Sequence, residues 1–310
     1  MNVLDVNFKS LKMINNKSLS IFLLLISSIA ISFGGLIMRN IEVANAWQII
    51  FYRSFFFSLS MSIILIFQYK FLFFNNVKKI GFPGLLGAIF YTFANIMFVH
   101  AFANTTVANA LFTLSAIPFL TAILAYYFLD ENLPLRTIII MMTAFLGIII
   151  MIGEGLALGQ LYGNLMALGT ALSFSCFAIT LRKFRNVDML PTLLVAGLFI
   201  LFVTFITYFK SFLIPFKDLF LCFLWGGILS GFVNYIFIYA TRYLYASSVT
   251  FFMLFEFALG PFWVFIFLNE TVSKNTLYGG LLVMVSVLVY SLFEIFNSSK
   301  KIKKGRINIS

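Results

Sequence analysis

An acidic residue stands near the middle of a long apolar run. Glu256 lies ten residues into the run 246–268, so in a helix it would sit about 15 Å from one boundary of a hydrocarbon layer about 30 Å thick. A charge at that depth costs about 2.5–3.5 kcal/mol on insertion scales, so the side chain is expected to face a cavity or a partner. Such a carboxyl group suits proton coupling or cation binding. A static ion pair, or a protonated and hydrogen-bonded carboxyl, is the structural alternative.

An arginine lies seven residues into another apolar run, 46–67, about 10 Å below its expected outer surface. The Arg53 guanidinium could bind a carboxylate through two parallel hydrogen bonds. It could also neutralise Glu256 at an overlapping depth, or extend its charged end towards the membrane surface.

Uncharged polar residues recur one helical turn apart in other runs. This spacing places two polar groups on one helix face, where they could contact a substrate or form hydrogen bonds between helices worth about 0.6 kcal/mol each. The candidate substrate contacts are Tyr91, Asn95, Asn109, Thr113 and Asn234. One Arg and one Glu among Asn and Tyr side chains suit a zwitterionic or moderately polar ligand.

Two prolines, Pro118 and Pro261, lie well inside apolar runs and are candidate hinges or gates. A proline within a helix frees a backbone carbonyl and bends the helix, although many such bends only curve it. The single histidine, His100, is expected at a membrane interface. The acidic residues at run ends, including Glu131, are expected to cap or bond neighbouring helices, with a gate as the alternative.

The composition excludes an ordinary soluble domain. The 310 residues are 62% hydrophobic and 10% charged, against about 25% charged residues in typical soluble domains. Ten runs approach the roughly 20 residues that span a bilayer. They cover residues 19–38, 46–67, 81–101, 106–129, 135–153, 162–182, 190–209, 218–241, 246–268 and 275–296.

The chain repeats itself with an offset of 139 residues. This offset maps Asn95 onto Asn234 and Glu131 onto Glu270 without a gap. Five runs per copy is an odd number, so the second copy must enter the membrane inverted, which is typical of transporters. The predicted repeats are 19–153 and 162–296, flanked by tails 1–18 and 297–310.

Basic residues set the expected orientation. With the N-terminus inside, 16 of the 21 Lys and Arg residues fall in inner segments and 4 in outer ones. Cytoplasmic loops carry such an excess, so both tails are predicted to be cytoplasmic, in an inner cell membrane. The net charge of +11 therefore needs no nucleic-acid partner.

These features together resemble the EamA-like family of the drug/metabolite transporter superfamily. The resemblance rests on the two five-helix repeats, on Arg53 early in the second run, and on the pattern from Pro118 to Glu131. It implies an all-α membrane fold of ten helices in two inverted repeats, with a central cavity for small metabolites. The family often has a Glu-Pro pair in helix 9, but here the proline follows later, at Pro261, so a kink is expected one turn later.

The function that these features favour is secondary-active transport of a small organic metabolite, such as an amino acid, a nucleoside or an S-adenosyl compound, by alternating access. A proton or a counter-substrate is the expected coupling partner because no ATP-binding motif occurs. A channel or structural membrane protein is the alternative, and an intramembrane enzyme is less favoured. The sequence predicts no catalytic residue, metal ligand or cofactor.

Overall fold

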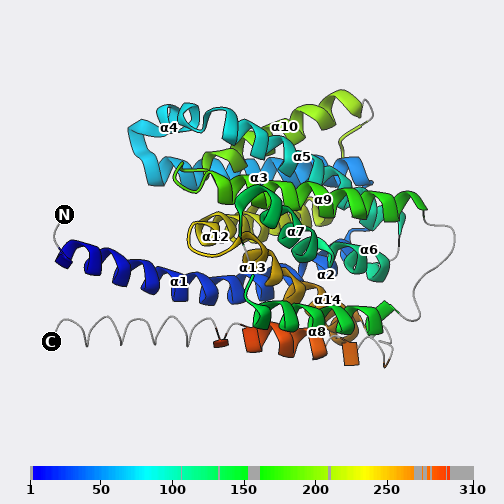
Figure 1. The fold of residues 1–310 in the computed structure, drawn as a ribbon. Helices are drawn as coiled ribbons and strands as arrows, with labels where there is room; N and C mark the ends of the chain where they lie inside the picture. The colour runs from blue at the N-terminus through cyan, green and yellow to red at the C-terminus, as the bar shows by residue number, and fades with distance from the viewer. Residues whose placement is uncertain are drawn as a thin grey trace.

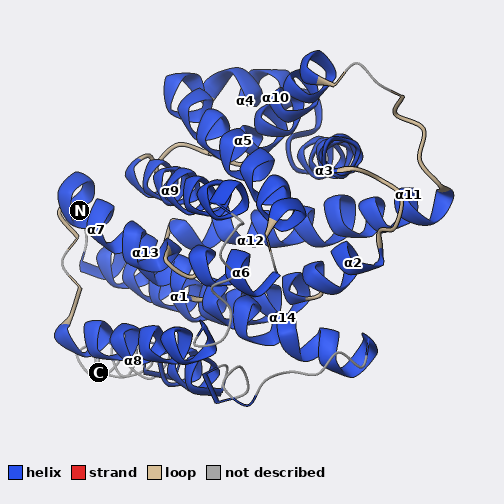
Figure 2. Cartoon of the chain, turned by 90° about the vertical axis from the view of Figure 1, so that its right-hand side faces the viewer, coloured by secondary structure: helices blue, strands red, loops and turns tan. Residues whose placement is uncertain are grey.

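The protein is described by a computed structural model, which covers the backbone of residues 3–105, 107–131, 133–152, 161–208 and 211–268 and short stretches between 274 and 293. Within these ranges the chain forms helices and loops, with no strand (Figure 2). This agrees with the all-α membrane fold expected from the sequence.

The described residues of the first half of the chain form nine helical segments (Figure 1). Their bounds are α1 Val3–Ser32, α2 Gly34–Asn40, α3 Ala46–Tyr69, η1 Lys70–Leu72, α4 Phe73–Lys79, α5 Gly81–Asn104, α6 Val107–Leu114, α7 Ile117–Leu129 and α8 Leu135–Ile152.

The second half continues with α9 Leu161–Lys183, α10 Pro191–Thr207, α11 Phe216–Cys222, the π-helical segment η2 Phe223–Ser230, α12 Gly231–Thr241, α13 Ala246–Phe251 and α14 Met253–Leu268. A further apolar helix covers Leu281–Tyr290.

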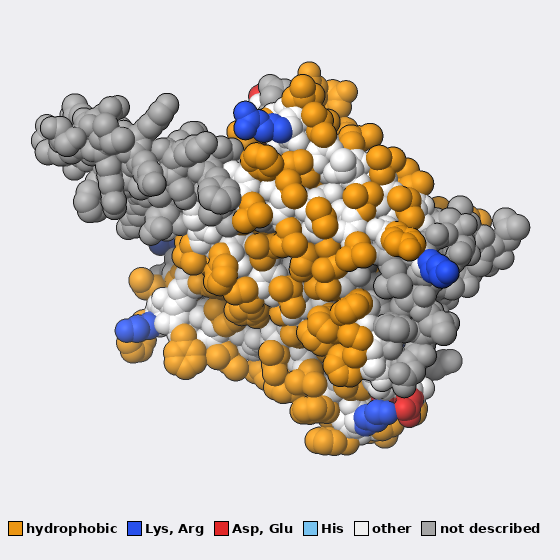
Figure 3. All heavy atoms as spheres, turned by 90° about the horizontal axis from the view of Figure 1, so that it is seen from below, with side chains coloured by type: hydrophobic (Ala, Val, Ile, Leu, Met, Phe, Trp, Pro, Cys, Tyr) orange, Lys and Arg blue, Asp and Glu red, His pale blue; other side chains and the backbone are white. Residues whose placement is uncertain are grey.

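Among the described residues, five helical stretches are long and apolar enough to cross a membrane. They are Asn16–Asn40, Ala46–Lys79, Gly81–Asn104, Leu161–Lys183 and Phe216–Thr241. Shorter apolar helices occupy Ile117–Leu129, Leu135–Gly147, Pro191–Thr207, Ala246–Gly260 and Leu281–Tyr290, each inside another of the predicted runs. Hydrophobic side chains cover most of the described part of the face drawn in Figure 3, with Lys and Arg at its margins. A surface of this kind fits a hydrocarbon environment.

The packing brings the two halves of the chain together. Helices α9 and α12 lie between α3, α5 and α10 on one side and α1 and α14 on the other (Figure 1). Helix α3 packs on α10 and η2, which both come from the second half. A Cβ atom at Gly226 would lie 2.1 Å from the Arg53 carbonyl oxygen, and one at Gly197 would lie 2.2 Å from Ser58 Oγ. Glycine at these positions therefore allows the halves to approach closely.

In the described part of the chain, three of the predicted runs are interrupted helices. In the run 19–38, α1 ends at Ser32 and α2 begins at Gly34. Helix α6 ends at Leu114 and α7 begins at Ile117, with Pro118 in the first turn of α7, where a missing N–H leaves no hydrogen bond unmade. In the second half, α13 ends before Phe252 and α14 then continues through Pro261. The interruption near Glu256 therefore precedes this residue by one turn, and it is separate from the kink expected near Pro261.

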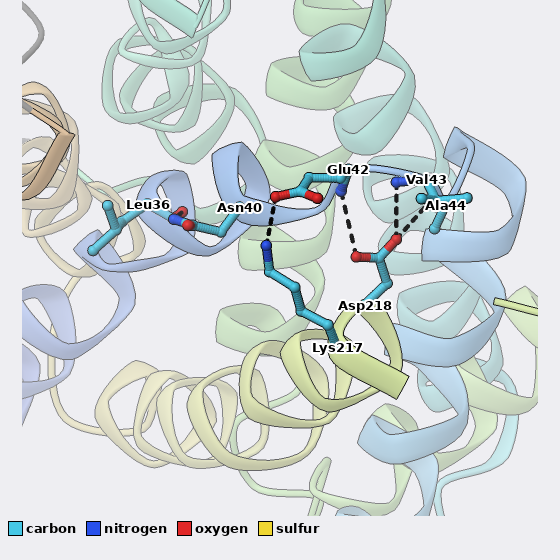
Figure 4. Close-up of polar contacts among 7 residues, drawn as sticks. All are labelled: Leu36, Asn40, Glu42, Val43, Ala44, Lys217 and Asp218. Atoms are coloured by element: carbon cyan, nitrogen blue, oxygen red, sulfur yellow. Dashed lines mark hydrogen bonds and ion pairs between the residues drawn. The ribbon is translucent and has the colours of Figure 1, made fainter. Parts of the chain in front are cut away.

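Polar contacts tie together the helix ends at the predicted outer rim. The buried Asp218 carboxylate at the start of α11 accepts hydrogen bonds from the backbone N–H groups of Glu42, Val43 and Ala44, at 3.3, 3.0 and 2.9 Å (Figure 4). Lys217 Nζ lies 2.5 Å from Glu42 Oε1 in an exposed ion pair. Together they fix the α2–α3 loop against the second half.

A buried ion pair holds the predicted inner rim. Arg182 Nε at the end of α9 lies 2.6 Å from Glu131 Oε1, which follows α7, and both side chains are about one-tenth exposed. Arg182 Nη1 also donates to the Thr241 carbonyl at 3.1 Å, and Glu131 Oε2 accepts from the Ala246 N–H at 3.3 Å. The pair therefore connects the ends of α7 and α9 with those of α12 and α13.

A second cluster lies beside this ion pair. Arg242 Nη2 is 2.6 Å from Asp188 Oδ1, and the Tyr69 hydroxyl donates to the same carboxylate. These contacts add the end of α3 to the inner rim.

Candidate functional site

A cavity of about 120 Å³ opens among helices from both halves of the chain. One water molecule needs about 10–15 Å³ of such volume, so the cavity has room for more than single solvent molecules. Its walls come from α1, α2, α3, α5, α6, α7, α9, η2, α12, α13 and α14. Because these helices meet only in the folded chain, the site depends on both halves.

Five of the residues selected from the sequence line this cavity. They are Arg53 on α3, Tyr91 and Asn95 on α5, Asn234 on α12 and Glu256 on α14. Residues that lie up to about 200 positions apart in sequence are thus brought to one space.

The other residues selected from the sequence either lie away from the cavity or have side chains outside the described residues. Thr113 is half-buried on α6 but does not line the cavity, because Leu111 and Leu114 occupy the facing side of that helix. Pro118 is buried in α7 beside the lining residue Ile117. The side chains of Asn109 and Pro261 lie outside the described residues.

The Arg53 guanidinium rests on aromatic rings. Its Cζ atom lies 4.4 Å from the ring centroid of Trp225 and 5.4 Å from that of Phe98. Among the described residues its hydrogen bonding is sparse: Nη2 lies 3.5 Å from Ser230 Oγ, and the buried Nε has no partner. Stacking on rings satisfies the faces of the guanidinium and leaves donors in its plane free for a ligand.

Glu256 faces the same cavity as Arg53 without pairing with it. No nitrogen–oxygen distance of 4.0 Å or less joins these two described side chains, and the Glu256 carboxyl has no hydrogen bond among the described residues. The direct ion pair considered as a structural alternative is therefore not formed in this structure. The Arg53 guanidinium and the Glu256 carboxyl therefore line the same cavity without an ion pair between them.

The two asparagines make matching local contacts. Asn95 Nδ2 donates to the Tyr91 carbonyl at 3.0 Å, and Asn234 Nδ2 donates to the Ser230 carbonyl at 2.8 Å. Each bond spans four residues along its own helix and fixes the amide orientation. Within the described part of the chain no hydrogen bond engages their Oδ1 atoms, which leaves an acceptor on each for a ligand.

Several residues that line the cavity were not predicted from the sequence. The Trp225 ring lies closer to the Arg53 guanidinium than the Phe98 ring does, and nothing in the local sequence of Trp225 distinguishes it from other aromatic residues. Serines on α1 also line the cavity, and Ser28 Oγ donates to the Phe252 carbonyl at 2.9 Å, at the interruption of the helix. The spacing of Ser28 and Ser32 at i,i+4 in an apolar run was an available signal.

His100 lies apart from the cavity. Its ring packs against Trp47 and Tyr162, with centroid distances of 4.6 and 6.3 Å, near the predicted outer end of α5. In the described part of the chain no cluster of three His, Cys, Asp or Glu residues could hold a metal ion.

Comparisons with known proteins agree with this architecture. Residues 18–153 match the model of the EamA-like transporter family. A solved structure described only as "Crystal structure of protein" is similar in fold, with a TM-score of 0.73 over 90% of this chain and 98% of that chain, at 13% sequence identity. A comparison with curated proteins finds no match. Residues 18–153 are thus similar to the EamA-like transporter family, a family of membrane transporters.

Proposed function

We propose that this protein is a secondary-active transporter that carries a small organic metabolite across the membrane by alternating access around the cavity. The observation that carries the proposal is the composition of the cavity wall. Positions separated by 139 residues line it in pairs, among them Asn95 with Asn234 and Phe98 with Phe237. A site formed by equivalent positions of two repeats lies on their pseudo-symmetry axis, where transporters of this kind bind their substrates.

Contacts between helices support two repeats of five helices each, over residues 19–153 and 162–296. Gly226 of η2 abuts the backbone of Arg53 on α3. At the positions related by 139 residues, Gly87 of α5 faces Thr192 of α10, and a Cβ atom on Gly87 would lie 3.2 Å from the threonine methyl. Each repeat thus contacts the other through equivalent residues. The match of the family model to residues 18–153 supports the same division.

The two rims support a gating role for the helix ends. The inner rim is held by the buried Glu131–Arg182 pair, while the position that corresponds to Arg182 in the first repeat is Val43. The outer rim therefore cannot form the same pair. We expect this conformation to be closed at the inner side, with both tails in the cytoplasm as the basic residues indicate.

The interrupted helices give the walls a place to bend. The breaks at Ser115–Ala116 and at Phe252 lie next to cavity-lining residues of α7 and α14. Discontinuous helices at membrane depth are typical of transporter binding sites. Pro118 and Pro261 remain candidate hinges beside these breaks.

The energy source follows from the residues available. The sequence contains no ATP-binding motif, so transport depends on a gradient or on exchange. Glu256 is the proposed coupling group, because a carboxyl in the cavity can bind either a proton or a cationic group. The proposed substrate classes are amino acids, nucleosides and S-adenosyl compounds, and the proposed location is the inner cell membrane.

Counterflow in proteoliposomes tests the proposal. Vesicles containing the purified protein would be loaded with unlabelled L-leucine, L-phenylalanine, adenosine or S-adenosylmethionine and diluted into a trace of the labelled compound. A carrier accumulates the label transiently, because influx and efflux share one site. Passive equilibration without accumulation would indicate a channel, and no protein-dependent flux of any of these compounds would contradict the proposed substrate classes.

A further inference from the structure

Arg53 and Glu256 place two groups of opposite charge in the cavity without an ion pair between them, and this narrows the class of the ligand. A charged group in a low-dielectric environment is costly unless another charge or a set of hydrogen bonds compensates it. Arg53 and Glu256 both line the cavity, and no ion pair joins them. A ligand with one negative and one positive group would compensate both at once.

The surroundings of Arg53 favour an anion with two oxygens in one plane. Trp225 and Phe98 cover the guanidinium at 4.4 and 5.4 Å from their centroids, so a ligand reaches it along its edge. One edge presents Nε, which is buried without a partner, and Nη2, whose contact with Ser230 Oγ is 3.5 Å long. A carboxylate can accept from both donors of such an edge in parallel.

Glu256 provides the complementary position for a cation. It projects from α14 one turn beyond the interruption at Phe252, and its carboxyl is free of hydrogen bonds among the described residues. The amide oxygens of Asn95 and Asn234 add neutral acceptors in the same cavity. An ammonium group donates several hydrogen bonds and would find acceptors here.

The remaining wall selects for the body of the ligand. Much of it is aromatic: Phe98, Phe102, Phe174, Trp225, Phe237 and Phe252 all line the cavity. An apolar body gains by leaving water for such a wall, whereas a sugar or a phosphate would leave its polar groups unmatched.

We propose that the cavity binds zwitterions that carry an apolar body, with the anionic group on Arg53 and the cationic group on Glu256. This assignment rests on the proposed transport function, since it specifies the substrate of the same cavity. It makes Arg53 and Glu256 the two residues that determine specificity, each for one end of the ligand.

Three compounds with the same apolar body separate the two ends. L-leucine carries both charges, L-leucinamide lacks the carboxylate, and 4-methylpentanoate lacks the amine. Affinities come from the thermal stability of the detergent-purified protein, because a ligand at 100 times its dissociation constant adds about 2.7 kcal/mol to stability. We expect the wild type to bind L-leucine at least tenfold more tightly than either analogue. The L-phenylalanine series would repeat the test with an aromatic body.

Variants then assign each end to its residue. In Arg53→Gln, the affinity for L-leucine should fall to the affinity for L-leucinamide. The affinity for L-leucinamide itself should not change. In Glu256→Gln, the affinity for L-leucine should fall to the affinity for 4-methylpentanoate. The affinity for 4-methylpentanoate itself should not change. Arg53→Lys keeps the charge without the two-donor edge and should give an intermediate loss, so the test remains valid if Arg53→Gln folds poorly.

Several outcomes would overturn the assignment. Equal binding of all three compounds, equal weakening of all three by both variants, or no binding in either series would each do so. Binding without counterflow would instead contradict the transport proposal and leave the zwitterion assignment intact. Counterflow of adenosine with no binding of either amino acid would support the transport proposal and overturn the zwitterion assignment.

Discussion

Removing the charge of Glu131 should open the inner side of the cavity. In the native protein the Arg182 side chain is about one-tenth exposed, and its Nε atom lies 2.6 Å from Glu131 Oε1. Glu131→Gln keeps the shape of the side chain but leaves the Arg182 guanidinium without a counter-charge. Breaking a buried pair in this way costs about 3–5 kcal/mol. In the proposed mechanism the helix ends that the pair connects separate when the inner side opens, so the cost falls on the closed state alone.

The lower end of this range is appropriate because the pair lies at a rim. A change of about 3 kcal/mol in favour of the inner-open state corresponds to a shift of more than about 100-fold in its population, at about 1.4 kcal/mol per factor of ten. A protein that is predominantly inner-closed would thus become substantially inner-open.

Chemical labelling from each side of the membrane measures this shift. Ser27 lines the cavity, so Ser27→Cys, in a chain whose Cys176 and Cys222 are replaced by Ser, reports its accessibility. A membrane-impermeant thiol reagent would be applied to right-side-out and inside-out vesicles. In Glu131→Gln, labelling from the inner side should rise and labelling from the outer side should fall.

The chain provides a matched control for this substitution. Glu42 pairs with Lys217 at the opposite rim at 2.5 Å, but these side chains are 68% and 55% exposed. Exposed pairs contribute about 0–1 kcal/mol, so Glu42→Gln should change the labelling by no more than about fivefold. If Glu131→Gln changes the labelling no more than this control does, the inner rim does not act as a gate.

Three further substitutions test other parts of the site. Glu256→Gln should abolish transport or remove its dependence on pH while expression stays normal, and counterflow with an unchanged pH profile would exclude the coupling role. Gly226→Ala should push η2 away from the Arg53 carbonyl and weaken ligand binding. Gly35 also lines the cavity, but a Cβ atom there meets no atom within 4 Å, so Gly35→Ala should leave binding unchanged. Equal effects of the two substitutions on ligand-induced stabilisation would contradict this reasoning. Asp218→Asn should lower the free energy of unfolding by about 1.5–3 kcal/mol, since the carboxylate accepts three backbone hydrogen bonds, and an unchanged melting temperature would refute that reasoning.

The sequence by itself determined the class of protein and the depth of its polar residues. Hydropathy and helical rise fix how far along a spanning helix a residue lies, so Glu256 and Arg53 were recognisable as groups within the membrane. The 139-residue offset related Asn95 to Asn234, and both line the cavity. These properties depend on one helix at a time or on the order of residues along the chain.

Only the tertiary structure decided which groups face one another. The stacking of Arg53 on Trp225 depends on the close approach of η2 to α3 at Gly226, which no pattern within either segment specifies. The separation of Arg53 from Glu256 and the break at Phe252 were likewise not evident, because the rotation of a helix about its axis and its distance from a neighbour are set by packing. Depth is encoded along the chain, whereas the partners of a side chain are chosen by the contacts between helices.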